Sequence, residues 1–229
     1  PASICTFGAN QDLVDVHLIT DSRPAEVPGS LLPNFHIHFM QLHQFTDLIR
    51  AKTGIQPNIS HLYKLSDFKP TYGQVFEDIL RPYAFWGYGD LDVLWGNLSA
   101  FITKQMLQTF DVIFPSPTKA TSHLAFIRNN HTMCRLWEKI HDIRRKLASS
   151  RQYFVDESEI FVPKHLRVEF HSHKPRNNLA FADLLYHHAN REQQSIMLLK
   201  GNVGILDCRG DKTPLHQVGV NCPNCLKIK

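Results

Sequence analysis

The chain has 229 residues, 43% of them hydrophobic, and its 25 basic and 21 acidic residues give a formal net charge of +4. This length fits one domain comfortably, and the apolar fraction is sufficient for a sizeable core. The basic residues form no long run, so the charge pattern is too weak to indicate nucleic-acid binding. The small positive charge is compatible with an anionic substrate or an acidic membrane surface.

Strands and helices are expected to alternate along the first third of the chain. Alternating apolar and polar residues predict strands, whereas apolar residues at a spacing of three or four predict helices. On these grounds strands are expected over residues 14–20 and 36–42, and helices over 44–52 and 67–80. Ser66 could cap the last of these helices, and Pro70 would be tolerated in its first turn.

The remaining elements follow the same alternation. Helices are expected over 100–109 and 132–147, and strands over 111–114 and 123–128. A further strand is expected to run through Phe85, Trp86 and Tyr88 into Asp90 and Asp92. The helix over 132–147 is the longest that we predict. Six of its apolar residues have helical spacing and are expected in the core: Met133, Leu136, Trp137, Ile140, Ile143 and Leu147. Alternating strands and helices imply an α/β fold with a mostly parallel central sheet flanked by helices.

The most informative motif stands at the end of this aromatic strand, where Asp90 and Asp92 are two residues apart. Alternate residues of an extended segment project to the same side, so both carboxylates could face one point. Two hard oxygen ligands suit Mg²⁺ or Mn²⁺ that also binds substrate phosphates. An Asp-x-Asp pair alone is common in turns, but the aromatic residues before it argue for a buried strand end, and Gly87 and Gly89 allow close backbone approach. The motif therefore predicts a metal–diphosphate site.

Two further positions could contact a nucleotide. Lys64 and Asp67 stand at an expected helix start, where a helix N-terminus and an ammonium group attract phosphate. A capped helix with solvated lysines explains the same residues. Asp21 follows the first strand and could contact a base or ribose, or simply cap a loop.

The acidic run at 156–159 is typical of a first helical turn, but Asp156 or Glu157 could also act as a general base for an acceptor hydroxyl. His171 and His173 stand on one side of an expected extended segment next to Lys174. A third metal ligand or a diphosphate contact is one interpretation of this segment.

Five segments together resemble a family of bacterial glycosyltransferase-like proteins associated with capsular and surface polysaccharides. They lie in order over the first two-thirds of the chain: HLITD (17–21), YKLSDFKPTYGQVF (63–76), FWGYGDLDVLWGNL (85–98), SHLAFIRN (122–129) and DES (156–158). The order is also similar to that of a wider group of Asp-x-Asp sugar transferases.

The resemblance implies a GT-A-like, Rossmann-like single domain in which a divalent cation, Mn²⁺ or Mg²⁺, bridges the motif to a UDP- or GDP-sugar. It implies that Asp92 is the main metal ligand and that Asp90 contacts the sugar, the ribose or the metal. The other roles that it implies are nucleotide or donor contacts for Asp21, Lys64 and Asp67, a sugar contact for His123, and a metal or diphosphate contact for His171 or His173. Lys174, next to His173, is the candidate for a further diphosphate contact.

Proteins of this kind begin with an apolar strand, whereas residues 1–13 look like the end of the following helix. We therefore expect a nucleotide-sugar-binding domain over 1–195 that lacks its first strand, followed by a tail over 196–229. Cys222 and Cys225 in this tail have the spacing of half a zinc site, but no second matching pair is present.

The resulting hypothesis is a metal-dependent glycosyltransferase that moves a sugar from a nucleotide-diphosphate donor to a glycan or lipid-linked glycan acceptor. A non-catalytic nucleotide- or glycan-binding protein is the alternative. No apolar run approaches the roughly 18 residues of a transmembrane helix, and the odd number of cysteines fits reduced thiols. We expect a cytoplasmic protein that does not bind nucleic acid, with peripheral association at the inner face of the membrane left open.

Overall fold

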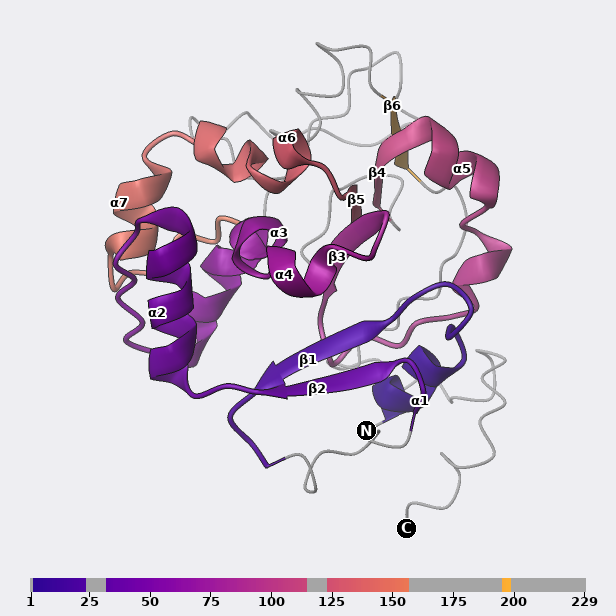
Figure 1. Ribbon diagram of the computed structural model, residues 1–229, viewed down its shortest axis with the longest axis horizontal. Coiled ribbons are helices and arrows are strands. Elements are labelled where there is room, and N and C mark those ends of the chain that lie inside the picture. The colour runs from indigo at the N-terminus through magenta and orange to yellow at the C-terminus, as the bar shows by residue number, and fades with distance from the viewer. Residues whose placement is uncertain (1, 24–31, 115–122, 157–194, 199–229) are drawn as a thin grey trace, which may run out of the picture. The chain divides into compact units, whose positions relative to one another are not determined.

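The computed structural model describes residues 2–23, 32–114, 123–156 and 195–198 (Figure 1). These residues divide into two compact units. The first unit contains the described parts of Pro1–Phe45 and Asp90–Lys104, and the second contains Thr46–Gly89 and the described parts of Gln105–Gly201. The chain passes from the second unit to the first between Gly89 and Asp90, directly before the Asp-x-Asp motif.

The first unit is built on a two-stranded parallel sheet. Strands β1 (Val16–Thr20) and β2 (Phe35–Phe39) pair in register from Val16 opposite Phe35 to Thr20 opposite Phe39. Helix α1 (Ala2–Gly8) and the short 3₁₀ helix η3 (Leu98–Ala100) also belong to this unit. Phe7 is its central apolar residue: it is 1% exposed, stacks on Phe35 at 6.0 Å and meets Trp95 edge-on at 4.6 Å between ring centroids.

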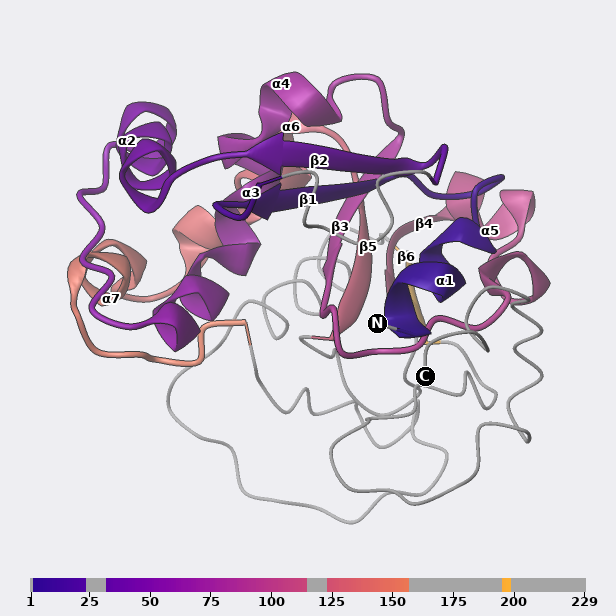
Figure 2. The same cartoon turned by 90° about the horizontal axis from the view of Figure 1, so that it is seen from below.

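The second unit contains a four-stranded mixed sheet in the order β3-β5-β4-β6, which Figure 2 shows side by side. Its strands are β3 (Phe85–Gly89), β4 (Phe110–Phe114), β5 (Leu124–Arg128) and β6 (Ser195–Leu198). Strand β5 runs antiparallel to both β3 and β4, whereas β6 runs parallel to β4.

The predicted fold class is therefore wrong. In the described residues the strands form one small parallel sheet and a separate sheet with two antiparallel pairings, and not a single, mostly parallel central sheet of GT-A type. The reason is that β4 and β5 are consecutive strands with no helix between them among the described residues, so the local alternation that predicts parallel crossovers does not extend through this region.

The expected strands themselves are confirmed to within two or three residues at each end, and the helix over 44–52 is found as α2 (Leu42–Thr53). The helix expected over 100–109 is shorter, α5 (Lys104–Thr109). The helix expected over 67–80 is replaced by three short pieces: the 3₁₀ helix η2 (Leu62–Thr71), α3 (Tyr72–Val75) and α4 (Glu77–Leu80). Ser66 lies inside η2 and its hydroxyl donates to the Tyr63 carbonyl, so it does not cap a helix.

The long helix expected over 132–147 is also broken, although its core positions are confirmed. It consists of α6 (His131–Cys134), the 3₁₀ helix η4 (Leu136–Lys139) and α7 (Ile143–Ala148). Ile140 adopts an extended conformation and Asp142 has a φ of 57°, which interrupts the helix between η4 and α7. All six predicted apolar residues are nevertheless at most 4% exposed. The helical spacing of these apolar residues therefore predicted their burial correctly, although the backbone between them is not a continuous helix.

Candidate functional site

The Asp-x-Asp motif lies in a turn at the surface. Strand β3 ends at Gly89, Asp90 follows it half-buried, and Leu91 and Asp92 form an exposed turn. The expectation that an extended segment continues through both aspartates is thus wrong, since Leu91 and Asp92 form a turn. Asp90 is thus partly exposed and Asp92 is exposed, so neither residue is fully buried.

The strand before the motif is buried, as predicted. Trp86 is 2% exposed and Tyr88 is 7% exposed, with Gly87 between them on the opposite face of the strand. A Cβ atom at Gly87 would lie 1.9 Å from the carbonyl oxygen of Ala125 in β5, which is far inside any possible contact distance. Glycine at this position allows β3 and β5 to approach closely, and this close pairing fixes the strand that leads to Asp90.

The segment after the motif is held in the first unit by side chains near α1. The backbone N–H of Trp95 donates to the Thr6 hydroxyl at 3.0 Å. The Asn10 amide donates to the carbonyl of Gly96 at 2.9 Å, and its oxygen accepts from the N–H of Leu98 at 2.8 Å. Sequence reasoning missed Asn10, because a single asparagine in a polar stretch carries no signal of such a role.

Lys64 and Asp67 form a fully buried ion pair in the second unit. Their side chains are 0% exposed, and Lys64 Nζ lies 2.9 Å from Asp67 Oδ2. Lys64 Nζ also donates to the carbonyls of Lys146 and Arg151 at 2.8 and 2.7 Å, while the Asp67 carboxylate accepts from the N–H groups of Tyr153 and Val155. The pair thus ties η2 to the chain after α7. The prediction that it contacts a sugar donor is untested, but in this arrangement neither side chain reaches the surface.

A second buried ion pair joins the same two segments. Lys69 Nζ of η2 lies 3.1 Å from Asp156 Oδ2, with Lys69 15% exposed and Asp156 0% exposed. The Lys69 ammonium also lies 5.8 Å from the centre of the Tyr88 ring in β3, within the range of a cation–π contact. Because Val155, next to Asp156, donates to Asp67, the structure brings Lys64, Asp67 and Asp156 together around η2.

The other predicted site residues are distributed over both units. Asp21 is exposed directly after β1, as expected of a residue at the carboxyl end of a strand, and the neighbouring Ser22 N–H donates to the Thr20 hydroxyl. His123 is half-buried and precedes Leu124, which pairs with Gly89 across the β3–β5 ladder. Four predicted residues lie outside the described residues: Glu157, His171, His173 and Lys174.

The chemistry of the motif fits a hard divalent cation. Carboxylate oxygens are the ligands that Mg²⁺ and Mn²⁺ prefer, and an exposed turn leaves room for water and phosphate oxygens in the remaining coordination positions. Within the described ranges, no three histidine, cysteine, aspartate or glutamate side chains gather closely enough to hold a metal ion. Asp90 and Asp92 would therefore share the cation with the substrate or with residues beyond those ranges.

Sequence reasoning also missed a group of histidines on the parallel sheet, His17, His36 and His38. The signal was present, since His36 and His38 alternate on a strand that pairs with the strand of His17. This group is described below.

The fold and the site thus define a protein with two separate small sheets and short helices, in which an Asp-x-Asp turn follows an aromatic strand. Residues 4–204 match the model of a protein family described as a family of unknown function, DUF6625, and the chain belongs to this family. No curated protein matches the chain, and no solved structure matches it either. Among the helices of the described residues, none has the length and apolar character that a membrane crossing requires.

Proposed function

We propose that this protein is a metal-dependent glycosyltransferase that transfers a sugar from a nucleotide-diphosphate donor to a glycan or lipid-linked glycan acceptor in surface-polysaccharide synthesis. The observation that carries the proposal is the position of Asp90 and Asp92, which follow a buried aromatic strand directly and remain accessible to solvent. The sequence resemblance supports the same activity. The expected parallel sheet is wrong and gives the proposal no support.

In this proposal the two aspartates hold Mn²⁺ or Mg²⁺ against the donor diphosphate. The bound cation supplies charge neutralisation on the departing nucleoside diphosphate. Asp21, exposed after β1, would contact the base or ribose, and His123 would border a sugar. Much of the remaining rate enhancement would come from alignment of donor and acceptor.

The two buried ion pairs support β3 and its neighbours in this proposal. Lys69 contacts both the Tyr88 ring and the Asp156 carboxylate, so it links the strand before the motif to the chain after α7. Since Asp156 is 0% exposed, its described position suits this supporting role better than proton transfer from an acceptor. Glu157 stays the predicted candidate for a general base, and the choice between retention and inversion of the sugar is left open.

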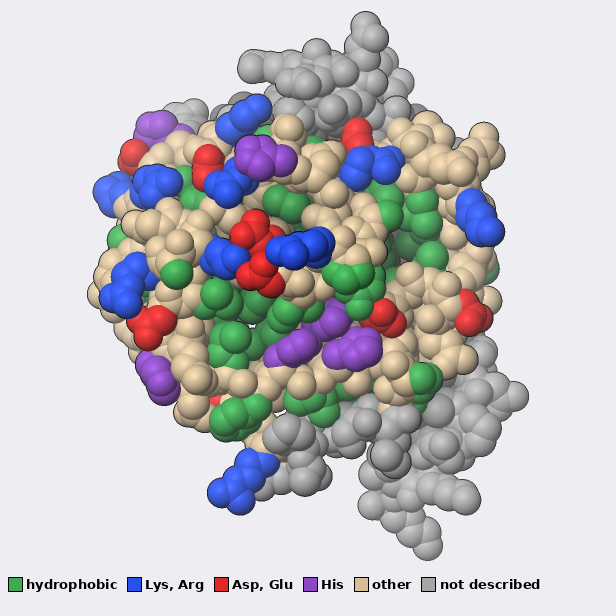
Figure 3. Space-filling view, viewed as in Figure 1, with side chains coloured by type: hydrophobic (Ala, Val, Ile, Leu, Met, Phe, Trp, Pro, Cys, Tyr) green, Lys and Arg blue, Asp and Glu red, His purple; other side chains and the backbone are tan. Residues whose placement is uncertain are grey.

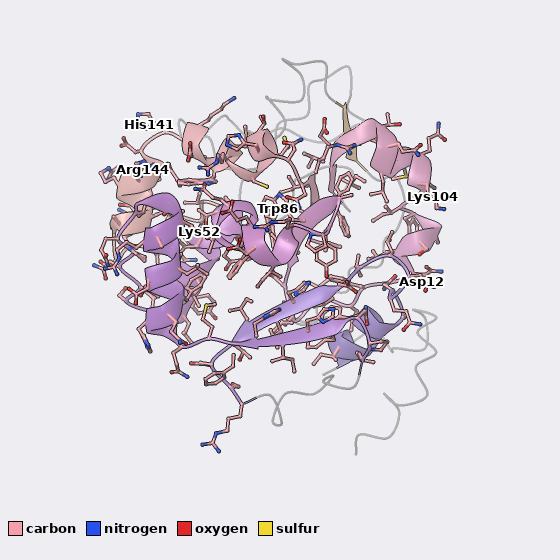
Figure 4. All side chains as sticks on the ribbon, in the orientation of Figure 1. Asp12, Lys52, Trp86, Lys104, His141 and Arg144 are labelled. Carbon is pink, nitrogen blue, oxygen red and sulfur yellow. The ribbon has the colours of Figure 1, made fainter. Side chains whose placement is uncertain are left out.

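The proposal is tested by thermal melts with UDP and with GDP, each with Mn²⁺ and then with EDTA. The protein is compared with Asp92→Asn and with the matched control Asp12→Asn, which changes an exposed aspartate of the first unit labelled in Figure 4. A nucleotide at about one hundred times its Kd should stabilise the folded protein by roughly 2.7 kcal/mol. We expect a Mn²⁺-dependent shift in the unmodified protein and in Asp12→Asn that is lost in Asp92→Asn.

Sugar release from a panel of UDP- and GDP-sugars then separates transfer from binding. Release that requires Mn²⁺ and Asp92 would support the transferase. A nucleotide-dependent shift without release from any donor would favour the non-catalytic binding protein, and a shift that survives in Asp92→Asn would refute the role of the motif.

We also propose a cytoplasmic location, where nucleotide sugars would be available, with peripheral association at the inner face of the membrane when the acceptor is lipid-linked. Fractionation of cells that express the protein, in low and in high salt, would test this location.

A further inference from the structure

Three histidines share one face of the parallel sheet in the first unit. His36 and His38 are two residues apart in β2, so their side chains project to the same side. His17 of β1 pairs directly with His36, which places it on the same face. Figure 3 shows histidine side chains gathered at the surface over β1 and β2.

The three imidazole rings are in contact. The ring centroids of His17 and His36 lie 4.7 Å apart, and those of His17 and His38 lie 5.2 Å apart. His17 Nδ1 and His38 Nε2 share a hydrogen bond at 2.9 Å, which a bound metal ion would replace. His36 Nε2 is shielded from solvent without a hydrogen-bond partner among the described residues, and Asp15 Oδ2 lies 3.8 Å from it, beyond hydrogen-bond distance.

We propose that His17, His36 and His38, together with Asp15, form a binding site for a divalent transition-metal ion such as Zn²⁺. Three imidazole nitrogens and one carboxylate oxygen make a four-ligand set that suits tetrahedral Zn²⁺. Imidazole ligands favour Zn²⁺, Ni²⁺ and Cu²⁺ over Mg²⁺ and Mn²⁺. This site therefore differs in its preferred metal from the carboxylate pair at Asp90 and Asp92.

The separation of the ring nitrogens fits shared coordination. Two nitrogens bound to one Zn²⁺ at about 2.0–2.1 Å lie about 2.9 Å apart at a right angle and about 3.4 Å apart at the tetrahedral angle. The 2.9 Å between His17 Nδ1 and His38 Nε2 already falls at the lower limit of this range. His36 and Asp15 must move, since no three metal-ligating side chains converge within the described part of the chain. The His36 side chain is 41% exposed and that of Asp15 is 35% exposed, so both lie partly at the surface.

The test is calorimetric titration with Zn²⁺ of the full chain. Cys222 and Cys225 are replaced by serine in every protein of the series, because thiolates bind Zn²⁺ tightly. His17→Asn and His38→Asn are compared with His141→Asn, whose side chain is 82% exposed and lies in the second unit, as labelled in Figure 4. We expect one Zn²⁺ per chain, an affinity reduced by about tenfold or more in His17→Asn and His38→Asn, and an unchanged affinity in His141→Asn.

A second measurement needs no histidine variant and so does not depend on how well the variants fold. Carbethoxylation of the serine-substituted chain by diethylpyrocarbonate is mapped by mass spectrometry with and without Zn²⁺. We expect Zn²⁺ to slow modification of His17, His36 and His38 but not of His141. Equal rates with and without Zn²⁺, or a Zn²⁺ affinity that survives in His17→Asn and His38→Asn, would overturn the proposal.

This site can be separated experimentally from the proposed transferase site. His38→Asn should retain the Mn²⁺-dependent nucleotide shift, and Asp92→Asn should retain Zn²⁺ binding. Loss of both properties in either variant would contradict the assignment of two independent sites.

Discussion

Replacement of Lys64 by methionine should destabilise the protein strongly, because it breaks an ion pair that is sealed from water. The substitution keeps most of the side-chain volume but removes three hydrogen bonds, to Asp67 and to the carbonyls of Lys146 and Arg151. It also leaves the Asp67 charge buried without its counter-ion. Removal of one partner of a buried pair costs about 3–5 kcal/mol. A domain of this size loses roughly 2–4 °C of Tm per kcal/mol, so the expected decrease is roughly 6–20 °C.

The matched control is Lys52→Met, labelled in Figure 4, which breaks an ion pair at the surface. Lys52 Nζ lies 2.8 Å from both Glu77 and Asp78, but these carboxylates are 50% and 65% exposed and regain water when the lysine is removed. Its Tm should stay within the scatter of repeat melts. The double variant Lys64→Met/Asp67→Asn removes both buried charges and keeps an acceptor oxygen at position 67, so it should be more stable than Lys64→Met alone.

Thermal melts followed by far-UV circular dichroism measure all three variants. If Lys64→Met unfolds at the same temperature as Lys52→Met, the buried pair does not contribute as described. If the double variant is no more stable than Lys64→Met, the loss does not come from the uncompensated carboxylate.

Two further predictions concern the sheets. Gly87→Ala should lower the Tm in circular dichroism melts or prevent folding, because its Cβ would overlap the Ala125 carbonyl. The control is Gly96→Ala, whose new Cβ has no atom within 4 Å, and it should melt at least 5 °C higher than Gly87→Ala. Burial, with the charges of His36 and His38, lowers the pKa of His17 to about 4 against the opposing effect of Asp15, so the unfolded chain binds the proton more readily between pH 6.5 and 4. The free energy of unfolding, measured in EDTA, should therefore decrease by about 1–2 kcal/mol as the pH falls through this window, after allowance for the partial exposure of His17. In His17→Asn the free energy of unfolding should change less with pH over the same window. An unchanged slope in this variant would refute the role of His17.

The sequence by itself determined where most strands lie and which apolar side chains of residues 133–147 are buried. Period-two alternation located β1 and β2, and helical spacing identified Leu136, Trp137 and their neighbours as core residues. These patterns are local, since each residue is placed by the burial of its own side chain. The same local logic located Asp90 at the end of a buried strand.

Only the tertiary structure decided how the strands pair and which polar residues are buried. The antiparallel direction of β5 depends on partners elsewhere in the sequence. The break at Asp142, where φ is 57°, is not indicated by the helical spacing of the apolar residues around it. Lys64 looked like a solvated lysine, yet it is fully buried because Asp67 and two carbonyls from a distant segment satisfy its charge. The histidine cluster likewise requires the β1–β2 register, since a shift by one residue would place His17 on the opposite face from His36 and His38.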